Sequence, residues 1–219
     1  MSIRLLHAAD IHLGYQQYGS PQRYHDFALA FGHLVDDALA QRVDYVLVAG
    51  DLFHQRTVDP LTLLQATDHL RRLRDAGIPV IAVEGNHERP HYLDKLSWLG
   101  YLAKTGLLIV LTPEYHDGTM VLEPWNERDR TGAYIDLPGG LRVIGAKYYG
   151  ATTARVLQDL SQAIPELPGG RPAYTVLMLH AGIQGVLDHY PATVSRAQLD
   201  VLRPYADYVA LGHIHKPFI

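Results

Sequence analysis

Residues 44–54 read Asp44-Tyr-Val-Leu-Val-Ala-Gly-Asp-Leu-Phe-His54, and this stretch decides the fold class. The run 45–49 is apolar without a break and has the length of a strand buried on both faces, which is typical of parallel sheets. Gly50 and Asp51 follow where this strand leaves the sheet. In open α/β sheets the reacting groups gather just beyond the carboxyl ends of the strands, so Asp51 and His54 are candidates for chemistry. Taken alone, Asp51 could equally cap a following helix.

The composition limits the chemistry that this chain can do. Its 219 residues are 47% hydrophobic and 19% charged, and a globular chain of this size buries roughly 70% of its unfolded surface in a single domain. Cysteine is absent, so any metal must be held by oxygen and imidazole ligands. The net charge of −4 does not indicate nucleic-acid binding through bulk charge, although a local basic patch is compatible with it.

The N-terminal stretch argues against export and membrane insertion. Arg4, His7 and Asp10 lie within its apolar run, which rules out a signal-peptide core, and no apolar run reaches transmembrane length. We therefore expect a cytoplasmic protein without membrane association.

Strands and helices alternate through the first half of the chain. The apolar runs predict strands at 3–9, 45–49, 79–83 and 107–111. Helices begin at Ser20-Pro21 and Asp59-Pro60, where a capping residue precedes a first-turn proline, and a third contains Leu96, Leu99 and Leu102. This alternation predicts a mostly parallel α/β layer.

The pattern changes from residue 112 onward. Short strands are expected near 119–123, 133–137 and 141–145, then a helix through 156–164 and buried strands at 174–179 and 208–211. A capping box at Ser195 to Gln198 predicts a short helix between the last two strands. The second half therefore favours a second sheet that is partly antiparallel.

Polar side chains stand at the carboxyl ends of five predicted strands. They are Asp10 and His12, Asp51 and His54, Asn86 and His87, His180, and His213 and His215. The other histidines follow no such strand and are expected in surface or packing roles. If the first strand continues to His12, Asp10 and His12 point the same way, as two ligands of one ion would.

Cations would compensate the cost of gathering so many imidazoles and carboxylates on one rim. Two aspartates, one asparagine and four histidines suffice for two divalent ions if one carboxylate is shared, and Asp51 on the central strand is the natural shared ligand. Imidazole, carboxylate and amide oxygen together suit manganese, iron or zinc better than magnesium or calcium.

The motifs occur in the order and approximate spacing of the calcineurin-like metallophosphoesterases, and the likeness spans nearly the whole chain. They are Asp10-Ile-His12, Gly50-Asp-Leu-Phe-His54, Gly85-Asn-His-Glu88, His180 and Gly212-His-Ile-His215. The sequences around these motifs more narrowly resemble the SbcD-type DNA repair exonucleases. They are His7-Ala-Ala-Asp-Ile-His-Leu-Gly14, Ala49-Gly-Asp-Leu-Phe-His54 and Asp207-Tyr-Val-Ala-Leu-Gly-His-Ile-His-Lys-Pro217. The resemblance implies an α/β fold in which a two-sheet sandwich is flanked by helices.

The resemblance also implies the role of each site residue. One ion would be held by Asp10, His12, Asp51 and His215, and the other by Asp51, Asn86, His180 and His213. The expected cofactors are two Mn²⁺ ions, and other divalent transition metals are compatible. His87 matches the catalytic histidine that protonates the leaving oxygen, and His54 matches a histidine that positions the phosphate.

Two departures from the family pattern stand out. Glu88 occupies a position where these nucleases usually have aspartate, and because that position is not a metal ligand, we expect little effect. The family continues past the last motif with a DNA-capping region and a segment that docks the ATPase. Residues 1–219 are therefore expected to form a nuclease catalytic domain without those regions.

The implied function is a manganese-dependent DNA nuclease, an exonuclease on DNA ends and an endonuclease on single strands. It would act in double-strand break repair with an SbcC-type ATPase, as a homodimer formed through helices near the third motif. Candidates for DNA contact on the rim are Tyr15, Gln16, Tyr18, Arg23, Gln55, Arg56, Arg89 and His91. Exposed loops are polar in any case, so an ordinary solvated surface is the alternative, and the DNA substrate is implied by the resemblance. Two rival functions stay open: a phosphodiesterase or phosphatase for small substrates, and a DNA-end binding scaffold whose metals serve mainly stability.

Overall fold

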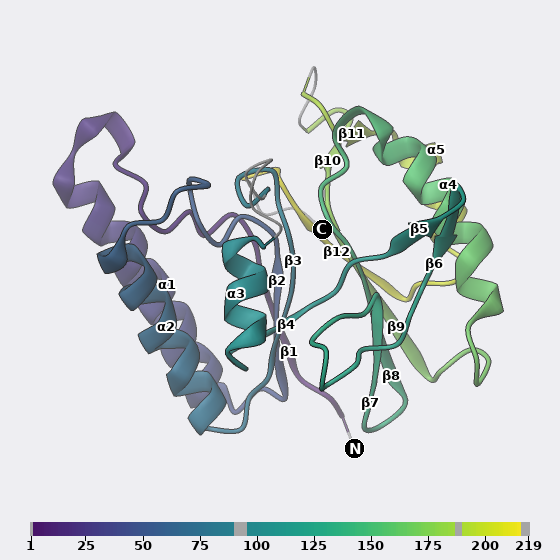
Figure 1. Ribbon diagram of the computed structural model, residues 1–219, viewed down its shortest axis with the longest axis horizontal. Coiled ribbons are helices and arrows are strands. Elements are labelled where there is room, and N and C mark those ends of the chain that lie inside the picture. Colours follow the sequence, from purple (N-terminus) through teal and green to yellow (C-terminus); the bar gives the residue numbers. More distant parts are fainter. Residues whose placement is uncertain (1, 90–95, 187–189, 216–219) are drawn as a thin grey trace.

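Two four-stranded sheets pack against each other, and helices cover their outer faces (Figure 1). The computed structural model describes residues 2–89, 96–186 and 190–215. Three apolar cores hold the layers together: one lies between the sheets, and each of the others lies under one set of helices. The expected α/β sandwich flanked by helices is confirmed.

The first sheet is entirely parallel. Its order is β1 (Leu5–Ala8), β2 (Tyr45–Ala49), β3 (Val80–Val83) and β4 (Ile109–Val110). Its helices are α1 (Pro21–Gln41), α2 (Pro60–Asp75) and α3 (Trp98–Lys104). β2 has the bounds that its apolar run predicts, since Val46 to Ala49 are all buried.

The two long helices begin at the expected prolines, but only one has a side-chain cap. The Asp59 carboxylate accepts hydrogen bonds from the N–H groups of Leu61 and Thr62, both at 3.0 Å. Ser20 makes no such bond, so the cap expected there is wrong and Pro21 alone favours the start of α1.

The second sheet has the order β12 (Tyr208–Gly212), β9 (Tyr174–His180), β8 (Leu141–Ala146) and β7 (Tyr134–Leu137). β7 runs antiparallel to β8 and the other pairs are parallel, so the expected mixed sheet is confirmed. α4 (Thr153–Ala163) and α5 (Arg196–Leu199) cover its outer face. The Ser195 capping box opens α5 as expected.

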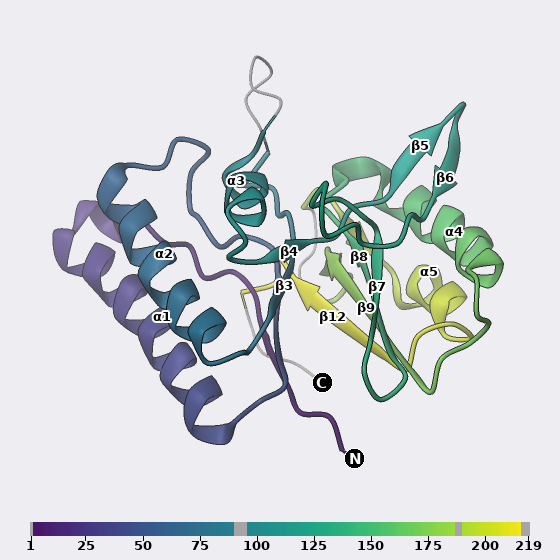
Figure 2. The same ribbon diagram turned by 60° about the horizontal axis from the view of Figure 1, so that its bottom comes forward.

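The smaller elements lie outside the two sheets. The hairpin of β5 (Glu114–His116) and β6 (Thr119–Val121) projects from the second half beside α4 (Figure 2). β10 (Gly182–Ile183) pairs with β11 (Thr193–Val194). Short 3₁₀ helices are η1 (Gln17–Gly19), η2 (Gly150–Thr152), η3 (Ile164–Glu166) and η4 (Asp200–Leu202). Among the described residues, no helix has both the length and the apolar character needed to cross a membrane.

β1 ends earlier than the sequence suggests, and this changes how the first ligands are placed. Asp10 and His12 have φ values of 55° and 52°, which are left-handed and cannot continue a strand. The N–H groups of Asp10 and His12 donate instead to the carbonyls of Gly50 and Asp51 at 3.1 and 2.9 Å. The strand does not continue to His12, so strand alternation does not align Asp10 with His12, and the turn after β2 positions them instead.

Candidate metal centre

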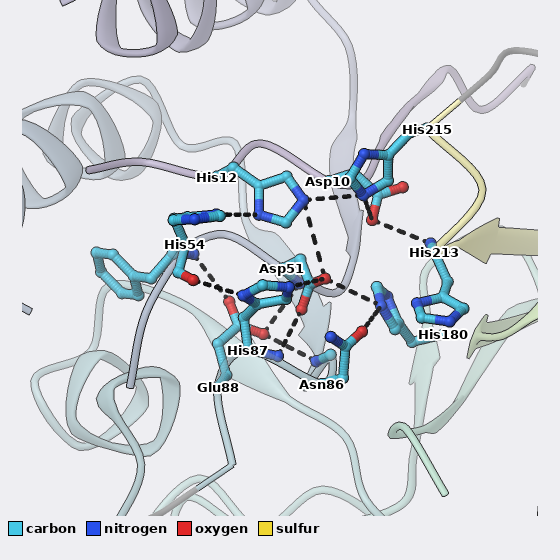
Figure 3. Close-up of polar contacts among 12 residues, drawn as sticks. Asp10, His12, Asp51, His54, Asn86, His87, Glu88, His180, His213 and His215 are labelled. Atoms are coloured by element: carbon cyan, nitrogen blue, oxygen red, sulfur yellow. Dashed lines mark hydrogen bonds and ion pairs between the residues drawn. The ribbon is translucent and has the colours of Figure 1, made fainter. Parts of the chain in front are cut away.

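Two groups of candidate ligands meet at the carboxylate of Asp51 (Figure 3). Ligand atoms of Asp10, His12, Asp51 and His215 lie within 4.8 Å of one another, and so do those of Asp51, His180 and His213. Asn86 joins the second group, since its Oδ1 lies 3.1 Å from Nε2 of His180. The structure thus brings together every residue expected to hold a metal, from both sheets, and their ligand roles stay predictions.

The Asp51 carboxylate is buried, with 1% of the residue exposed. Its Oδ2 lies 3.2 Å from Nε2 of His180 and 4.0 Å from Nε2 of both His12 and His87. This oxygen makes no hydrogen bond of regular geometry to the described residues. Ligand atoms about 2.1 Å from one ion lie about 3 Å apart when they meet at right angles. A buried carboxylate oxygen that lacks a regular hydrogen bond and is faced by imidazole nitrogens fits a divalent cation.

The groups of this cluster differ in charge, because contacts keep Asp51 anionic while burial keeps His12 neutral. Burial alone would raise the pKa of Asp51, but His180 and the N–H of His87 outweigh it and lower that pKa to about 2. Burial disfavours a charged His180, but the Asp51 carboxylate outweighs it and raises the pKa of His180. Burial also lowers the pKa of His12 to about 3, so this imidazole stays neutral and keeps a lone pair for a cation.

Close backbone packing fixes the positions of Asp51 and His180. The Nδ1 of His180 is 2.7 Å from the carbonyl of Ala49, across the two sheets. Gly50 has φ 91°, and a Cβ at this position would lie 2.2 Å from that same Nδ1. Glycine is therefore required before Asp51 both for the conformation and for the approach of His180.

The first ligand group is also held by contacts between residues of the two halves of the chain. The Asp10 Oδ1 accepts a hydrogen bond from the N–H of His213 at 3.0 Å and lies 3.6 Å from Nε2 of His215. The Nε2 atoms of His12 and His215 are 3.0 Å apart. Two imidazole nitrogens at this distance are spaced as ligands of a common ion would be.

His87 and His54 line the open side of the cluster. The Nδ1–H of His87 donates to the carbonyl of His54 at 2.5 Å, which leaves Nε2 on the Asp51 side. Tyr15 stacks on His54 with ring centroids 3.8 Å apart, and His54 stacks on His87 at 5.1 Å. Nitrogens of His12, His54 and His87 also form a third compact group, so a ligand role for His87 is the alternative to proton transfer.

Glu88 has more contacts in the site than the sequence suggests. It is 3% exposed, and its carboxylate accepts hydrogen bonds from the N–H groups of Asp51, Phe53 and Gly85. Burial raises the pKa of Glu88 to about 8, while the donors from Gly85 and Phe53 act in the opposite direction. As expected, Glu88 belongs to neither ligand group that shares Asp51. The prediction that glutamate in place of aspartate has little effect at this position stays a prediction.

The expected DNA-contacting residues are placed unequally. Tyr15 lines a cavity of about 890 Å³ that opens onto the first ligand group. Arg23 instead pairs with Asp26 at 3.0 Å, and Arg56 is exposed. The guanidinium carbon of Arg89 lies 4.8 Å from the ring centroid of Tyr148. Of the remaining candidates, Gln16 and Gln55 lie in loops, Tyr18 lies in η1, and His91 lies outside the described residues.

Tyr148 is a site residue that sequence reasoning missed. Its ring lies 5.3 Å from the ring of His213 and 6.0 Å from that of His180. It follows β8, whose end carries no motif, so its proximity to the second ligand group depends on the packing of the two sheets. Arg89 packs against Tyr148 and so lies on the same side of the second ligand group.

Comparison with known proteins agrees with this geometry. A family model described as calcineurin-like phosphoesterase matches residues 3–217. The DNA double-strand break repair protein Mre11 of Archaeoglobus fulgidus is 33% identical over 99% of this chain and 47% of its own length. Mre11 of Aeropyrum pernix is 32% identical over 99% of this chain and 50% of its own.

Haloferax volcanii Mre11 is 48% identical over 47% of this chain and 24% of its own length. The chain spans about half the length of the curated relatives that it matches from end to end.

Proposed function

The chain belongs to the calcineurin-like phosphoesterase family, and from this premise we propose that it is a DNA nuclease that hydrolyses phosphodiester bonds with two divalent cations. The single observation that carries the proposal is the buried Asp51 carboxylate shared by two ligand groups. The DNA substrate is supported by relatives named as double-strand break repair proteins. The proposed activities are exonuclease on DNA ends and endonuclease on single strands.

The proposed cation positions follow the two ligand groups. Asp10, His12, Asp51 and His215 would hold one ion, and Asp51, Asn86, His180 and His213 the other. Membership of the family implies divalent metal binding. Manganese is the proposed metal because the resemblance to SbcD-type nucleases implies it, and the mixed imidazole and oxygen ligands of both groups suit manganese, iron or zinc. When bound, two such cations supply charge stabilisation at phosphorus and activate water.

The proposed work of the chain itself is to orient the phosphate and deliver a proton. The carbonyl of His54 holds Nδ1–H of His87, so Nε2 of His87 is the atom that can give a proton to the leaving oxygen. The stack of Tyr15 on His54 holds that imidazole at the mouth of the cavity, where it can bind a phosphate oxygen. Arg89, which is exposed beside Tyr148, is the proposed contact for a neighbouring phosphate.

Further proposals concern assembly and location. We propose that residues 1–219 form the nuclease catalytic domain and act in the cytoplasm with an SbcC-type ATPase. A homodimer through α2 and the region of α3 is supported by exposed apolar side chains there. Leu61 and Leu64 are each 51% exposed, Leu96 is 48% exposed and Tyr101 is 40% exposed. Covering these side chains in a dimer would remove apolar surface from water.

Digestion of end-labelled linear DNA, with and without Mn²⁺, tests the proposal. We expect cleavage by the wild-type protein with Mn²⁺ and none by Asp51→Asn. A chromogenic phosphodiester turned over far faster than DNA would replace the nuclease with a small-substrate phosphodiesterase. DNA retained by Asp51→Asn, with no cleavage by wild type, would indicate a DNA-end binding scaffold instead.

A further inference from the structure

Glu88 directs its carboxylate at backbone groups of the metal centre. Its Oε2 accepts hydrogen bonds from the N–H groups of Asp51 at 3.0 Å and Gly85 at 2.8 Å. Its Oε1 accepts one from Phe53 at 3.1 Å. The carboxylate therefore joins the turn after β2 to the turn after β3.

A second hydrogen bond joins the same two turns in the opposite direction. The N–H of His87 donates to Oδ1 of Asp51 at 3.0 Å. Each of the two carboxylates thus accepts an N–H group from the turn that carries the other, which closes a ring. The ring is tight, because a Cβ at Gly85 would lie 2.0 Å from Oδ1 of Asp51 and 2.6 Å from its nitrogen.

This ring controls groups that bear on both cation positions. Asp51 has φ 55°, a conformation that a residue other than glycine keeps only where its surroundings fix it. The bond from its N–H to Glu88 is one such contact. The other turn carries Asn86, of the second ligand group, and His87, the proposed proton donor. Movement of Glu88 would break its hydrogen bonds to the backbone of both turns.

We propose that Glu88 is a positioning residue that sets the affinity of both cation positions by holding the turns of Asp51 and Asn86 in register. This inference rests on the proposed function only in that cations bind at Asp51. Partners that orient metal ligands typically change metal affinity by 10- to 100-fold when they are removed.

The test is Glu88→Gln, measured by Mn²⁺ titration with electron paramagnetic resonance. The amide oxygen can accept bonds from two N–H groups, but the NH₂ group then faces the third. We expect the Kd for Mn²⁺ to rise by at least tenfold at both positions, at a temperature where circular dichroism shows the variant folded. A folded Glu88→Gln with the wild-type Kd would overturn the inference.

Asp207→Asn is the matched control. The Asp207 carboxylate accepts the N–H of Thr175 at 2.8 Å and a bond from Arg171 at 3.0 Å, at the amino ends of β9 and β12. The same carboxylate-to-amide change there should lower the Tm and leave the Kd for Mn²⁺ unchanged. If Asp207→Asn weakened Mn²⁺ binding as much as Glu88→Gln does, Glu88 would have only a general structural role.

Hydrogen exchange on the wild-type protein decides the case in which Glu88→Gln does not fold. Mn²⁺ should slow exchange of the amides of Asp51, Phe53 and Gly85 at least tenfold more than it slows that of Thr175. Equal exchange with and without Mn²⁺ would overturn the inference. Wild-type protein that binds Mn²⁺ but leaves DNA intact would contradict the proposed nuclease and leave the role of Glu88 standing, whereas absence of Mn²⁺ binding would overturn both.

Discussion

The Nε2 of His180 lies 3.2 Å from Oδ2 of Asp51, although the two residues belong to different sheets. His180 ends β9 in the second sheet, and Asp51 follows β2 in the first. Their contact, together with that of Asp10 and the N–H of His213, places the ligand groups along the line where the sheets meet. The site therefore depends on sheet packing as much as on its motifs.

The shared position of Asp51 predicts an unequal effect of two similar substitutions. Asp51→Asn removes the anion common to both groups, whereas Asp10→Asn removes one from the first group alone. In an Mn²⁺ titration, Asp10→Asn should keep one strong position and Asp51→Asn should lose both, with affinities at least tenfold weaker. Two strong positions in Asp51→Asn would contradict the sharing.

The proposed proton transfer by His87 predicts a dependence on the leaving group. His87→Gln should slow DNA cleavage about 10²- to 10⁴-fold, because an alkoxide leaving group needs a proton. A p-nitrophenyl phosphodiester, whose leaving group needs none, should lose far less activity. Mn²⁺ stoichiometry should stay at the wild-type value. Loss of a bound ion would instead make His87 a ligand with His12 and His54.

The close approach of Gly50 to His180 predicts that two glycine substitutions differ in kind. Gly50 and Gly77 have φ values of 91° and 74°, so alanine is strained at both by about 1 kcal/mol. Nothing lies within 4 Å of a Cβ at Gly77, but one at Gly50 would meet His180 Nδ1 at 2.2 Å. Gly77→Ala should lower the Tm and leave Mn²⁺ affinity intact, and Gly50→Ala should lose that affinity. Equal Mn²⁺ affinities in the two variants would show that His180 can move aside without cost.

The cap of α2 predicts a stability difference that disappears in acid. The side-chain hydrogen bond from Thr62 lowers the pKa of Asp59 in the folded state. The ionised Asp59 therefore stabilises the folded state at pH values above its unfolded-state pKa, and this stabilisation is lost as the pH falls through the folded-state pKa. Asp59→Ala should lower the free energy of unfolding by about 1 kcal/mol near pH 7, which corresponds to a decrease in Tm of about 2–4 °C. Thermal scans from pH 7 to pH 3 should show this gap closing. A difference in Tm that does not change with pH would show that the charge of Asp59 does not contribute to the cap.

The elements that could be predicted are those whose signals are local. β2 is an uninterrupted apolar run, and α2 begins where an aspartate precedes a proline, so both have the expected starts. β5 was not predicted, because all of its residues are exposed and no burial imposes an alternating pattern. Its place depends on pairing with β6 beside α4.

The site divides in the same way. The candidate ligands could be named because each motif follows a strand, and parallel strands bring their carboxyl ends together. The left-handed turn at Asp10 and the contacts of Glu88 could not, because both depend on backbone groups of the Asp51 turn. Tyr148 likewise has no local signal and acquires its neighbours from the opposing sheet.

Cations bound at the proposed positions would take ligands from both sheets and would therefore also hold the two sheets together. With metal present, the halves of the sandwich should melt together in a single calorimetric peak. Chelation should broaden or split that peak, since the apolar interface and a few hydrogen bonds, such as that between His180 and the carbonyl of Ala49, would then join the two layers. Loss of metal would in this way change the thermal unfolding of the whole molecule and not only the structure at its rim.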